Sequence, residues 1–209
     1  MKIGIIQASS QKGKNSIIEK CVVEAVPKEY EVINFGVFDN DKVNISYIQI
    51  AICIGLLLES KAVDFIITGC SSGQGIMLAC NSLPGVICGY VENVTDAYLF
   101  GRINNGNAIS YTLGMNWGWT GEINFRETVK ALFCEPLGNG FPPEDAERKK
   151  KDSQQLKDMN KLCKKSMLEI LPLLDRENLQ TALNYRNVYQ YILENGNNIE
   201  LMEKIKKYR

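Results

Sequence analysis

Residues 63–81 read VDFIITGCSSGQGIMLACN, and this stretch decides the fold class. Its first six residues form a run that is apolar apart from Asp64 and Thr68, of the kind found in strands buried on both faces of a parallel sheet. A turn that contains Gly69, Gly73 and Gly75 follows, and the apolar residues after it begin a helix. A buried strand, a tight turn and a helix in this order predict one unit of an α/β domain.

The same alternation extends outward from this unit over residues 1–134. The pattern predicts strands at residues 3–6, 30–35, 63–68, 86–90 and 108–112, and helices at residues 15–26, 46–61, 74–81, 95–103 and 122–133. Repeated strand–helix units imply a five-stranded parallel sheet with right-handed crossovers and helices on both faces. Ligands bind such sheets at the carboxyl ends of the strands, which places the loops after Ile6, Thr68, Tyr90 and Thr112 near the expected site.

A change in composition marks the end of this domain. Residues 135–143 read EPLGNGFPP, a linker rich in Gly and Pro. Beyond it, residues 144–174 are charged but carry an apolar stripe formed by Leu156, Met159, Leu162, Cys163, Met167, Ile170 and Leu171. Residues 177–193 predict one further helix, followed by a charged tail. We therefore expect a domain at 1–134 and a helical extension at 135–209 that packs on the core or on a partner subunit.

Composition excludes several classes of protein. Basic and acidic residues balance at 24 each, so no global charge favours nucleic acid or an anionic membrane. The start runs straight into an expected strand without a signal peptide, and no apolar run approaches the roughly 20 residues that span a bilayer. The 7 cysteines form no CxxC pair, which favours a reducing cytoplasm. Histidine is absent, so Cys, Asp, Glu, Lys, Tyr or water must carry any proton transfer.

The glycine turn is the first candidate for chemistry. Successive backbone N–H groups in such a turn, together with a helix N-terminus, can bind a phosphate, a carboxylate or an enediolate oxyanion. Cys70 lies at the mouth of this turn, where positive potential favours a thiolate that can shuttle a proton between carbons. The turn lacks the GK[ST] ending of a Walker motif and follows the third strand, not the first as a dinucleotide fingerprint does. A tight turn whose cysteine only packs is the structural alternative.

Two further polar clusters flank the expected strands. Residues 102–107 read RINNGN, in which Asn104 could bind a sugar hydroxyl or an oxyanion and Arg102 an anionic group. The alternative is a helix C-cap, where Asn and Gly are favoured. Residues 9–15 read SSQKGKN, in which Ser10 and Lys14 could bind the anionic end of a substrate or could belong to a solvated loop that caps a helix.

These residues carry a family resemblance. Residues 69–86, GCSSGQGIMLACNSLPGV, followed by residues 96–110, DAYLFGRINNGNAIS, resemble the ribose-5-phosphate isomerase B and galactose-6-phosphate isomerase family. That family has a C-G-T-G-x-G turn, then A-N-x-x-P-G, then an H-N-x-x-N segment. The resemblance covers about residues 1–134, with the motifs in the family's order and spacing.

The resemblance implies a Rossmann-like sheet and an aldose–ketose isomerase that works through a cis-enediolate, without metal or cofactor. It also implies a small-molecule sugar substrate and a homodimer, or a dimer of dimers, with composite sites. The family's base falls on Cys70, its turn hydroxyl on Ser72, and its oxyanion-binding Asn on Asn104. The amides that bind the substrate fall on the turn, at Ser71, Ser72, Gly73, Gln74 and Gly75. Some members place a Glu base where this chain has Gln74.

Departures from the family pattern bear on the substrate. The family's Asp-His after the first strand corresponds to about Ala8-Ser9, its ring-opening His to Ile103, and its phosphate-binding Arg has no counterpart in residues 113–117. The aromatic stretch at 117–119 and the helical extension resemble a longer branch that includes isomerases of 4-deoxy-5-hexosulose uronate. Such a substrate has a carboxylate in place of a phosphate and is largely open-chain. A sugar phosphate, an inactive sugar-binding protein and a nucleotide-binding oxidoreductase are the alternatives.

Overall fold

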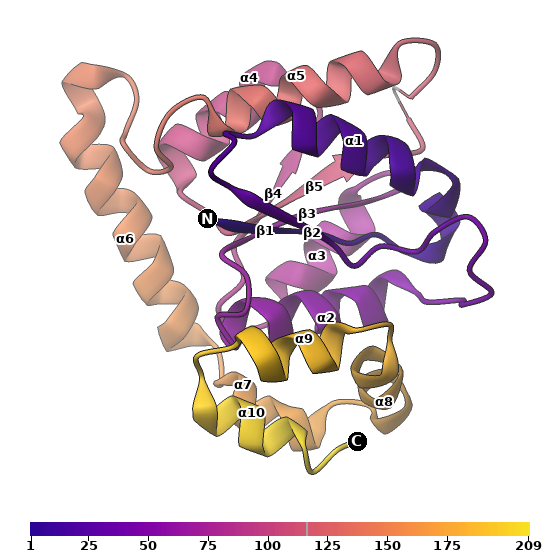
Figure 1. Cartoon of the computed structure of the whole chain (residues 1–209). Helices are drawn as coiled ribbons and strands as arrows, with labels where there is room; N and C mark the ends of the chain where they lie inside the picture. The colour runs from indigo at the N-terminus through magenta and orange to yellow at the C-terminus, as the bar shows by residue number, and fades with distance from the viewer. Residues whose placement is uncertain (116) are drawn as a thin grey trace.

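The computed structural model describes residues 1–115 and 117–209, and it contains the predicted parallel sheet. The strands are β1 (Lys2–Ile5), β2 (Glu31–Asn34), β3 (Phe65–Cys70), β4 (Cys88–Val91) and β5 (Ala108–Thr112). They lie in the order β2-β1-β3-β5-β4, and each neighbouring pair is parallel. The five-stranded α/β architecture predicted from the alternation of strands and helices is therefore confirmed (Figure 1).

One face of the sheet is covered by α1 (Asn15–Ala25), α4 (Val94–Leu99) and α5 (Gly121–Phe133). Successive residues of a strand point to opposite faces, so Phe65 and Ile67 of β3 both point to this layer. There they pack in one buried cluster with residues of α1 and α5, among them Val22 and Phe125. The apolar positions that predicted amphipathic helices thus form the core of this layer.

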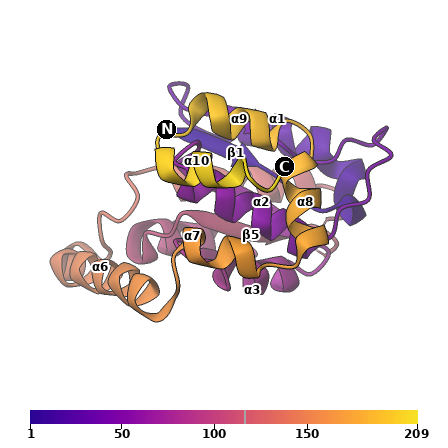
Figure 2. The ribbon, with the colours of Figure 1, turned by 90° about the horizontal axis from the view of Figure 1, so that it is seen from below.

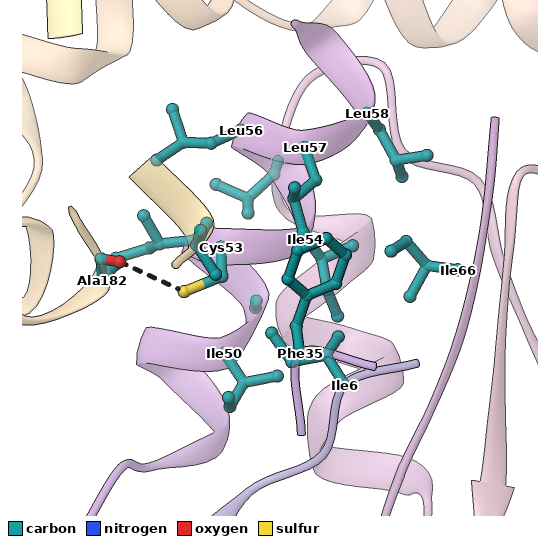
Figure 3. Packing of buried hydrophobic residues seen from close by; sticks show 14 of the residues in the cluster. Ile6, Phe35, Ile50, Cys53, Ile54, Leu56, Leu57, Leu58, Ile66 and Ala182 are labelled. Atoms are coloured by element: carbon teal, nitrogen blue, oxygen red, sulfur yellow. Dashed lines mark hydrogen bonds between the residues drawn. The ribbon is translucent and has the colours of Figure 1, made fainter. Parts of the chain in front are cut away.

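The opposite face is covered by α2 (Tyr47–Glu59) and α3 (Gln74–Asn81). Helix α2 starts at a capping box, in which Ser46 and Gln49 bond each other's backbone N–H groups, and it is buried continuously from Ile50 to Leu58. Figure 3 shows why: sheet-side residues such as Ile66 lie on one side of α2, while Cys53 on the other side points its sulfur at the Ala182 carbonyl, 3.5 Å away. A helix that is apolar all round requires such a second layer.

The C-terminal extension supplies that layer. It comprises α6 (Ala146–Cys163), α7 (Met167–Ile170), α8 (Arg176–Asn184), α9 (Val188–Asn195) and α10 (Ile199–Ile205). Helices α7 to α10 lie under α2 and share its buried cluster through residues such as Met167, Leu183 and Leu201 (Figure 2). The prediction that the extension is helical and packs on the core is confirmed for these four helices.

Two predicted details of the extension are wrong. Residues 177–193 were predicted as one helix but form α8 and α9, because Arg186 between them takes a left-handed backbone conformation with φ of 44°. The charged tail was not predicted as a helix but contains α10, which starts where the Asn198 side chain accepts the Leu201 N–H. The apolar stripe of 144–174 is also divided, since α6 ends at Cys163 and a new capping box at Ser166 and Glu169 starts α7.

Short helical turns complete the chain: η1 (Ser9–Lys14), η2 (Phe100–Asn104), η3 (Pro143–Asp145) and η4 (Leu171–Leu173). The helix predicted at 95–103 is α4 continued by η2. Within the described residues, no helix has the length and apolar character needed to cross a membrane.

Candidate active site

The crevice between β1 and β3 is the topological switch point of the sheet. Helix α1, which follows β1, covers one face, and α3, which follows β3, covers the other. The loops that follow β1 and β3 therefore run to opposite faces of the sheet and leave a crevice at the carboxyl ends of these two strands. Open α/β sheets bind their ligands in such a crevice. A hydrogen bond bridges the two loops, from the Gln11 side-chain amide in η1 to the Ser71 hydroxyl after β3, at 2.7 Å.

Gly73 fixes the shape of the turn between β3 and α3. Its φ is +75°, and a Cβ at this position would lie 2.7 Å from the Tyr90 ring, so a side chain meets both strain and a clash. The Ser110 hydroxyl of β5 donates to the Gly73 carbonyl oxygen at 2.6 Å and holds the turn against the sheet. Helix α3 begins at the next residue, so its first N–H groups have no acceptor within the helix.

Cys70 is the last residue of β3 and pairs in register with Thr112 of β5. It is half-buried at the start of the glycine turn. Other cysteines differ in environment: Cys21, Cys53, Cys80 and Cys88 are buried, while Cys134 and Cys163 are exposed and lie away from this edge. Burial raises the pKa of the Cys53 thiol far above its ordinary value, which suits an inert core residue.

The turn residues Ser71, Ser72 and Gln74 are exposed at the carboxyl edge. The Ser72 hydroxyl accepts the Gln74 N–H at 3.3 Å, an arrangement that places a hydroxyl beside the first turn of α3. Gly75 follows in the same turn, with the Tyr47 ring 3.7 Å from the position that its Cβ would take. The structure therefore brings the predicted turn residues together next to Cys70, and in a single chain it leaves Ser71, Ser72 and Gln74 exposed.

Lys14 reaches this edge through Gln11. Its ammonium group donates to the Gln11 side-chain oxygen at 2.8 Å and lies 6.0 Å from the centre of the Trp117 ring. Burial lowers the pKa of Lys14 from its ordinary value. A Lys14–Gln11–Ser71 chain thus connects a cation to the glycine turn. Ser10 lies exposed in the same loop.

Two residues near the turn were not predicted. Gln11, in the loop singled out after β1, forms the bridge to Ser71. Tyr90, at the end of β4, donates its hydroxyl to the Glu92 carboxylate and lies beside Gly73. Burial raises the pKa of Tyr90, and the bond to Glu92 acts in the same direction. Tyr90 ends the strand predicted at residues 86–90, and this position at the carboxyl edge of the sheet could have indicated that it lies near the site.

Asn104 and Arg102 lie at the opposite edge of the sheet. Both belong to η2, which precedes β5, whereas Cys70 lies beside Thr112 at the other end of β5. At about 3.3 Å per residue, the length of β5 alone separates the two edges by about 13 Å. Asn104 is exposed there, and the left-handed cap of η2 is the next residue, Asn105. One chain therefore does not bring Asn104 to Cys70.

Arg102 does not reach the Cys70 edge of its own chain either. Its side chain is 1% exposed, and its guanidinium donates to the Leu132 carbonyl oxygen at 2.8 Å and lies over the Tyr98 ring. These contacts join η2 to α5 through Leu132 and to α4 through Tyr98. The family's phosphate-binding Arg has no counterpart in residues 113–117 of this sequence. Of these residues, Asn116 lies outside the described part of the chain.

Comparison with known proteins shows which family the chain resembles along its length. The family model for ribose/galactose isomerases matches residues 5–133. A solved 4-deoxy-L-threo-5-hexosulose-uronate ketol-isomerase in complex with a tartrate is 34% identical, with a TM-score of 0.94 over 100% of this chain and 99% of its own. A ribose-5-phosphate isomerase from Vibrio parahaemolyticus is 34% identical, with a TM-score of 0.95 over the same shares. The type B ribose 5-phosphate isomerase of Trypanosoma cruzi, at 19% identity and a TM-score of 0.64 over 77% of this chain and 98% of its own, shares the fold.

The parallel fold and these matches define the class as a sugar isomerase. The resemblance seen in the turn and in residues 96–110 is confirmed by the matches along the whole chain. The chain belongs to the ribose/galactose isomerase family.

Proposed function

We propose that this protein interconverts the aldose and ketose forms of a small sugar acid through a cis-enediolate, with Cys70 as the base. The observation that carries the proposal is the half-buried Cys70 at the end of β3, directly before a turn whose conformation Gly73 fixes. A thiolate and a set of preorganised N–H donors are the two components that an enolisation requires.

The reaction follows from the placement of these groups. The open-chain sugar lies with its carbonyl oxygen and neighbouring hydroxyl over the amides of residues 71–75. The Cys70 thiolate takes the proton from C2 of the aldose, and the charge that develops on the oxygen is stabilised by those amides. Cys70 then returns the proton to C1, and the hydroxyl proton moves to the other oxygen, which gives the ketose. The Ser72 hydroxyl, bonded to the Gln74 N–H, orients the substrate beside the thiol.

A second copy of the chain completes this site in our proposal. Ser71, Ser72 and Gln74 of the glycine turn are exposed, and Asn104 is exposed at the far edge of the same sheet. In a symmetric dimer, the η2 edge of one chain can cover the Cys70 edge of the other, and the second site is completed in the same way. Asn104 of the second copy then supplies a neutral donor to the oxyanion. A homodimer, or a dimer of dimers, is therefore part of the proposed function.

Charge supports a carboxylate as the anionic end of the substrate. A phosphate dianion is usually held by Arg, through bidentate and charge-assisted hydrogen bonds. At the carboxyl edge, Lys14 is the cation joined to the glycine turn, whereas Arg102 is buried elsewhere. One Lys with hydroxyl and amide donors suits a monoanionic carboxylate. The 34% identity to a uronate ketol-isomerase over the full length agrees with this choice, although a ribose-5-phosphate isomerase is equally similar.

A kinetic comparison tests the substrate class. We expect kcat/KM for 4-deoxy-5-hexosulose uronate to exceed the values for ribose 5-phosphate, allose 6-phosphate and galactose 6-phosphate by at least about tenfold, or about 1.4 kcal/mol of transition-state stabilisation. The absence of histidine favours this result, because an open-chain keto acid needs no acid–base pair for ring opening. An equal or higher value for any of the phosphorylated sugars would show that the site is built for phosphate.

A further inference from the structure

Tyr90 lies on the same face of the sheet as Cys70, with β5 between their strands. Tyr90 of β4 pairs in register with Ser110 of β5. Cys70 of β3 pairs with Thr112, two residues further along β5. Because alternate residues of a strand share a face, all four side chains project from the side of the sheet that α3 covers. The glycine turn, which joins β3 to α3, leads to this same side.

Three of these side chains support the glycine turn. The Ser110 hydroxyl donates to the Gly73 carbonyl oxygen at 2.6 Å, and the Thr112 hydroxyl donates to the Ser71 carbonyl oxygen at 3.2 Å. The Tyr90 ring packs against Gly73, where a Cβ would lie 2.7 Å from the ring. Ser110 and Thr112 are buried, and Tyr90 is half-buried. The turn therefore rests on β4 and β5, and its position depends on these side chains.

The Tyr90 hydroxyl makes contacts beyond the packing of its ring. It donates to the Glu92 carboxylate, and since a phenol has one proton, its oxygen can only accept hydrogen bonds from other neighbours. Burial and the bond to Glu92 raise the pKa of Tyr90, whereas hydrogen bonding by the Thr112 and Gln74 side chains acts in the opposite direction. Gln74 is the first residue of α3. The hydroxyl therefore connects Glu92 to the start of the helix that follows the glycine turn.

The backbone at Glu92 is held by the cap of α4. The Glu92 N–H donates to the Asp96 carboxylate at 3.1 Å, and the Asn93 side-chain amide donates to the same carboxylate at 3.0 Å. Asn93 in turn accepts the Asp96 N–H at 3.0 Å as the N-cap of α4. A hydrogen bond to an ionised group is about twice as strong as one between neutral groups. Glu92 can thus hold the Tyr90 hydroxyl in one orientation.

We propose that Glu92 and Tyr90 are positioning residues for the isomerisation. Glu92 fixes the direction of the Tyr90 hydroxyl, and Tyr90 holds Gln74 and Gly73 in place. The amides of residues 71–75 then stay aligned with the oxygen on which charge develops. The inference rests on the proposed function, because it assigns a support to the same oxyanion site. Both residues act through the turn, where a misplacement of about 1 Å can cost about 10² in rate.

The variant Tyr90→Phe tests this role in the full-length protein. Phe keeps the ring against Gly73 but loses the bonds to Glu92 and Gln74. We expect kcat to fall about tenfold while KM stays within about twofold, because alignment with the transition state is lost and substrate binding is kept. The control is Tyr98→Phe on α4, which removes a hydroxyl that donates to Glu135 at 3.4 Å and should leave kcat unchanged.

Variants of Glu92 separate positioning from a general loss of stability. Glu92→Ala should lower kcat as much as Tyr90→Phe does, whereas Glu92→Gln should restore most of the rate, because its side-chain oxygen can still accept the phenol proton. The double variant Tyr90→Phe and Glu92→Ala should be no slower than either single variant, since both changes break one connection. Effects on kcat that simply multiply would contradict a shared role.

Hydrogen–deuterium exchange gives a readout that does not depend on activity. In Tyr90→Phe, peptides that cover residues 70–77 should exchange about tenfold faster than in the wild type, and in Tyr98→Phe they should not. Unchanged exchange in Tyr90→Phe, or a kcat within about twofold of the wild type, overturns the inference. A wild-type protein that isomerises no sugar would count against the proposed function, and the exchange rates alone would then decide whether Tyr90 supports the turn. Loss of activity in Cys70→Ala with full activity in Tyr90→Phe would overturn the inference and leave the proposed function intact.

Discussion

Replacement of Cys70 by Ala is expected to abolish isomerisation while the fold persists. Loss of a positioned proton-transfer group costs about 10² to 10⁴ in rate, and no other thiol lies at the carboxyl edge within residues 1–115 and 117–209. The change replaces a small, half-buried side chain by another small one, so the core around it keeps its packing. Steady-state kinetics together with a thermal melt measure both effects.

The matched control is Cys134→Ala, which removes an exposed thiol at the end of α5, far along the chain from the glycine turn. It should retain full activity. If Cys70→Ala keeps activity within about tenfold of wild type at an unchanged melting temperature, another group transfers the proton and the assigned base is wrong. A protein that turns over no sugar derivative even with Cys70 intact would instead be a binding protein.

Replacement of Asn104 by Ala is expected to have a comparably large effect, although Asn104 lies at the far edge of its own sheet. Removal of one preorganised donor to an oxyanion typically costs about 10² to 10³ in kcat. Asn104 is exposed, so its loss should leave folding unchanged. Among residues 1–115 and 117–209 of one chain, no hydrogen bond or ion pair links Asn104 to Cys70.

Mixing the two inactive variants distinguishes a composite site from a local one. After dissociation and reassociation, a random mixture of Cys70→Ala and Asn104→Ala chains contains about half mixed dimers, each with one intact and one doubly defective site. Activity should then recover to about a quarter of the wild-type value per site. Recovery is impossible if both residues serve a site built from one chain, so a mixture that stays inactive despite confirmed subunit exchange contradicts the proposal. Each variant mixed with itself is the control.

The strands and helices of residues 1–134 could be predicted because local sequence patterns specify them. The run at 63–68 and the glycine turn after it specify a buried strand and a helix start, and the same signals recur around them. The order of strands was not predicted, since the insertion of β5 between β3 and β4 depends on packing between segments distant in sequence. That order decides which loops meet, and therefore that Gln11 bonds to Ser71.

The errors in the extension have a local origin. The Ser-x-x-Glu pattern at Ser166 and Glu169 is a helix-start signal, and it marks the point at which the apolar stripe passes from α6 to α7. The prediction of one stripe over residues 144–174 did not use this signal. By contrast, the break between α8 and α9 occurs at Arg186, a residue type that gives no warning of a left-handed conformation. Its side chain pairs with Asp41 from the loop after β2, a long-range contact that local sequence does not reveal.

The candidate site was predicted in part for the same reason. Cys70, Ser72 and their neighbours belong to one turn, so sequence proximity alone brings them together. Arg102 was named for its charge and its place near the Asn cluster, yet it points inward to Leu132 and Tyr98 and is 1% exposed. Orientation of a side chain on a helical turn depends on what packs against it, which a single sequence does not specify.

Proton exchange with solvent tests the central claim most directly. If Cys70 carries a proton from C2 to C1 through an enediolate, the ketose formed from 4-deoxy-5-hexosulose uronate in heavy water should carry deuterium at C1, because a proton held on a thiol can exchange with solvent before it is returned. Proton NMR of the isolated product measures this incorporation, with the Cys70→Ala protein as the control for spontaneous exchange. We predict deuterium in the product of the wild-type reaction. Complete conversion without any deuterium would contradict the mechanism and point to direct hydride transfer between the two carbons.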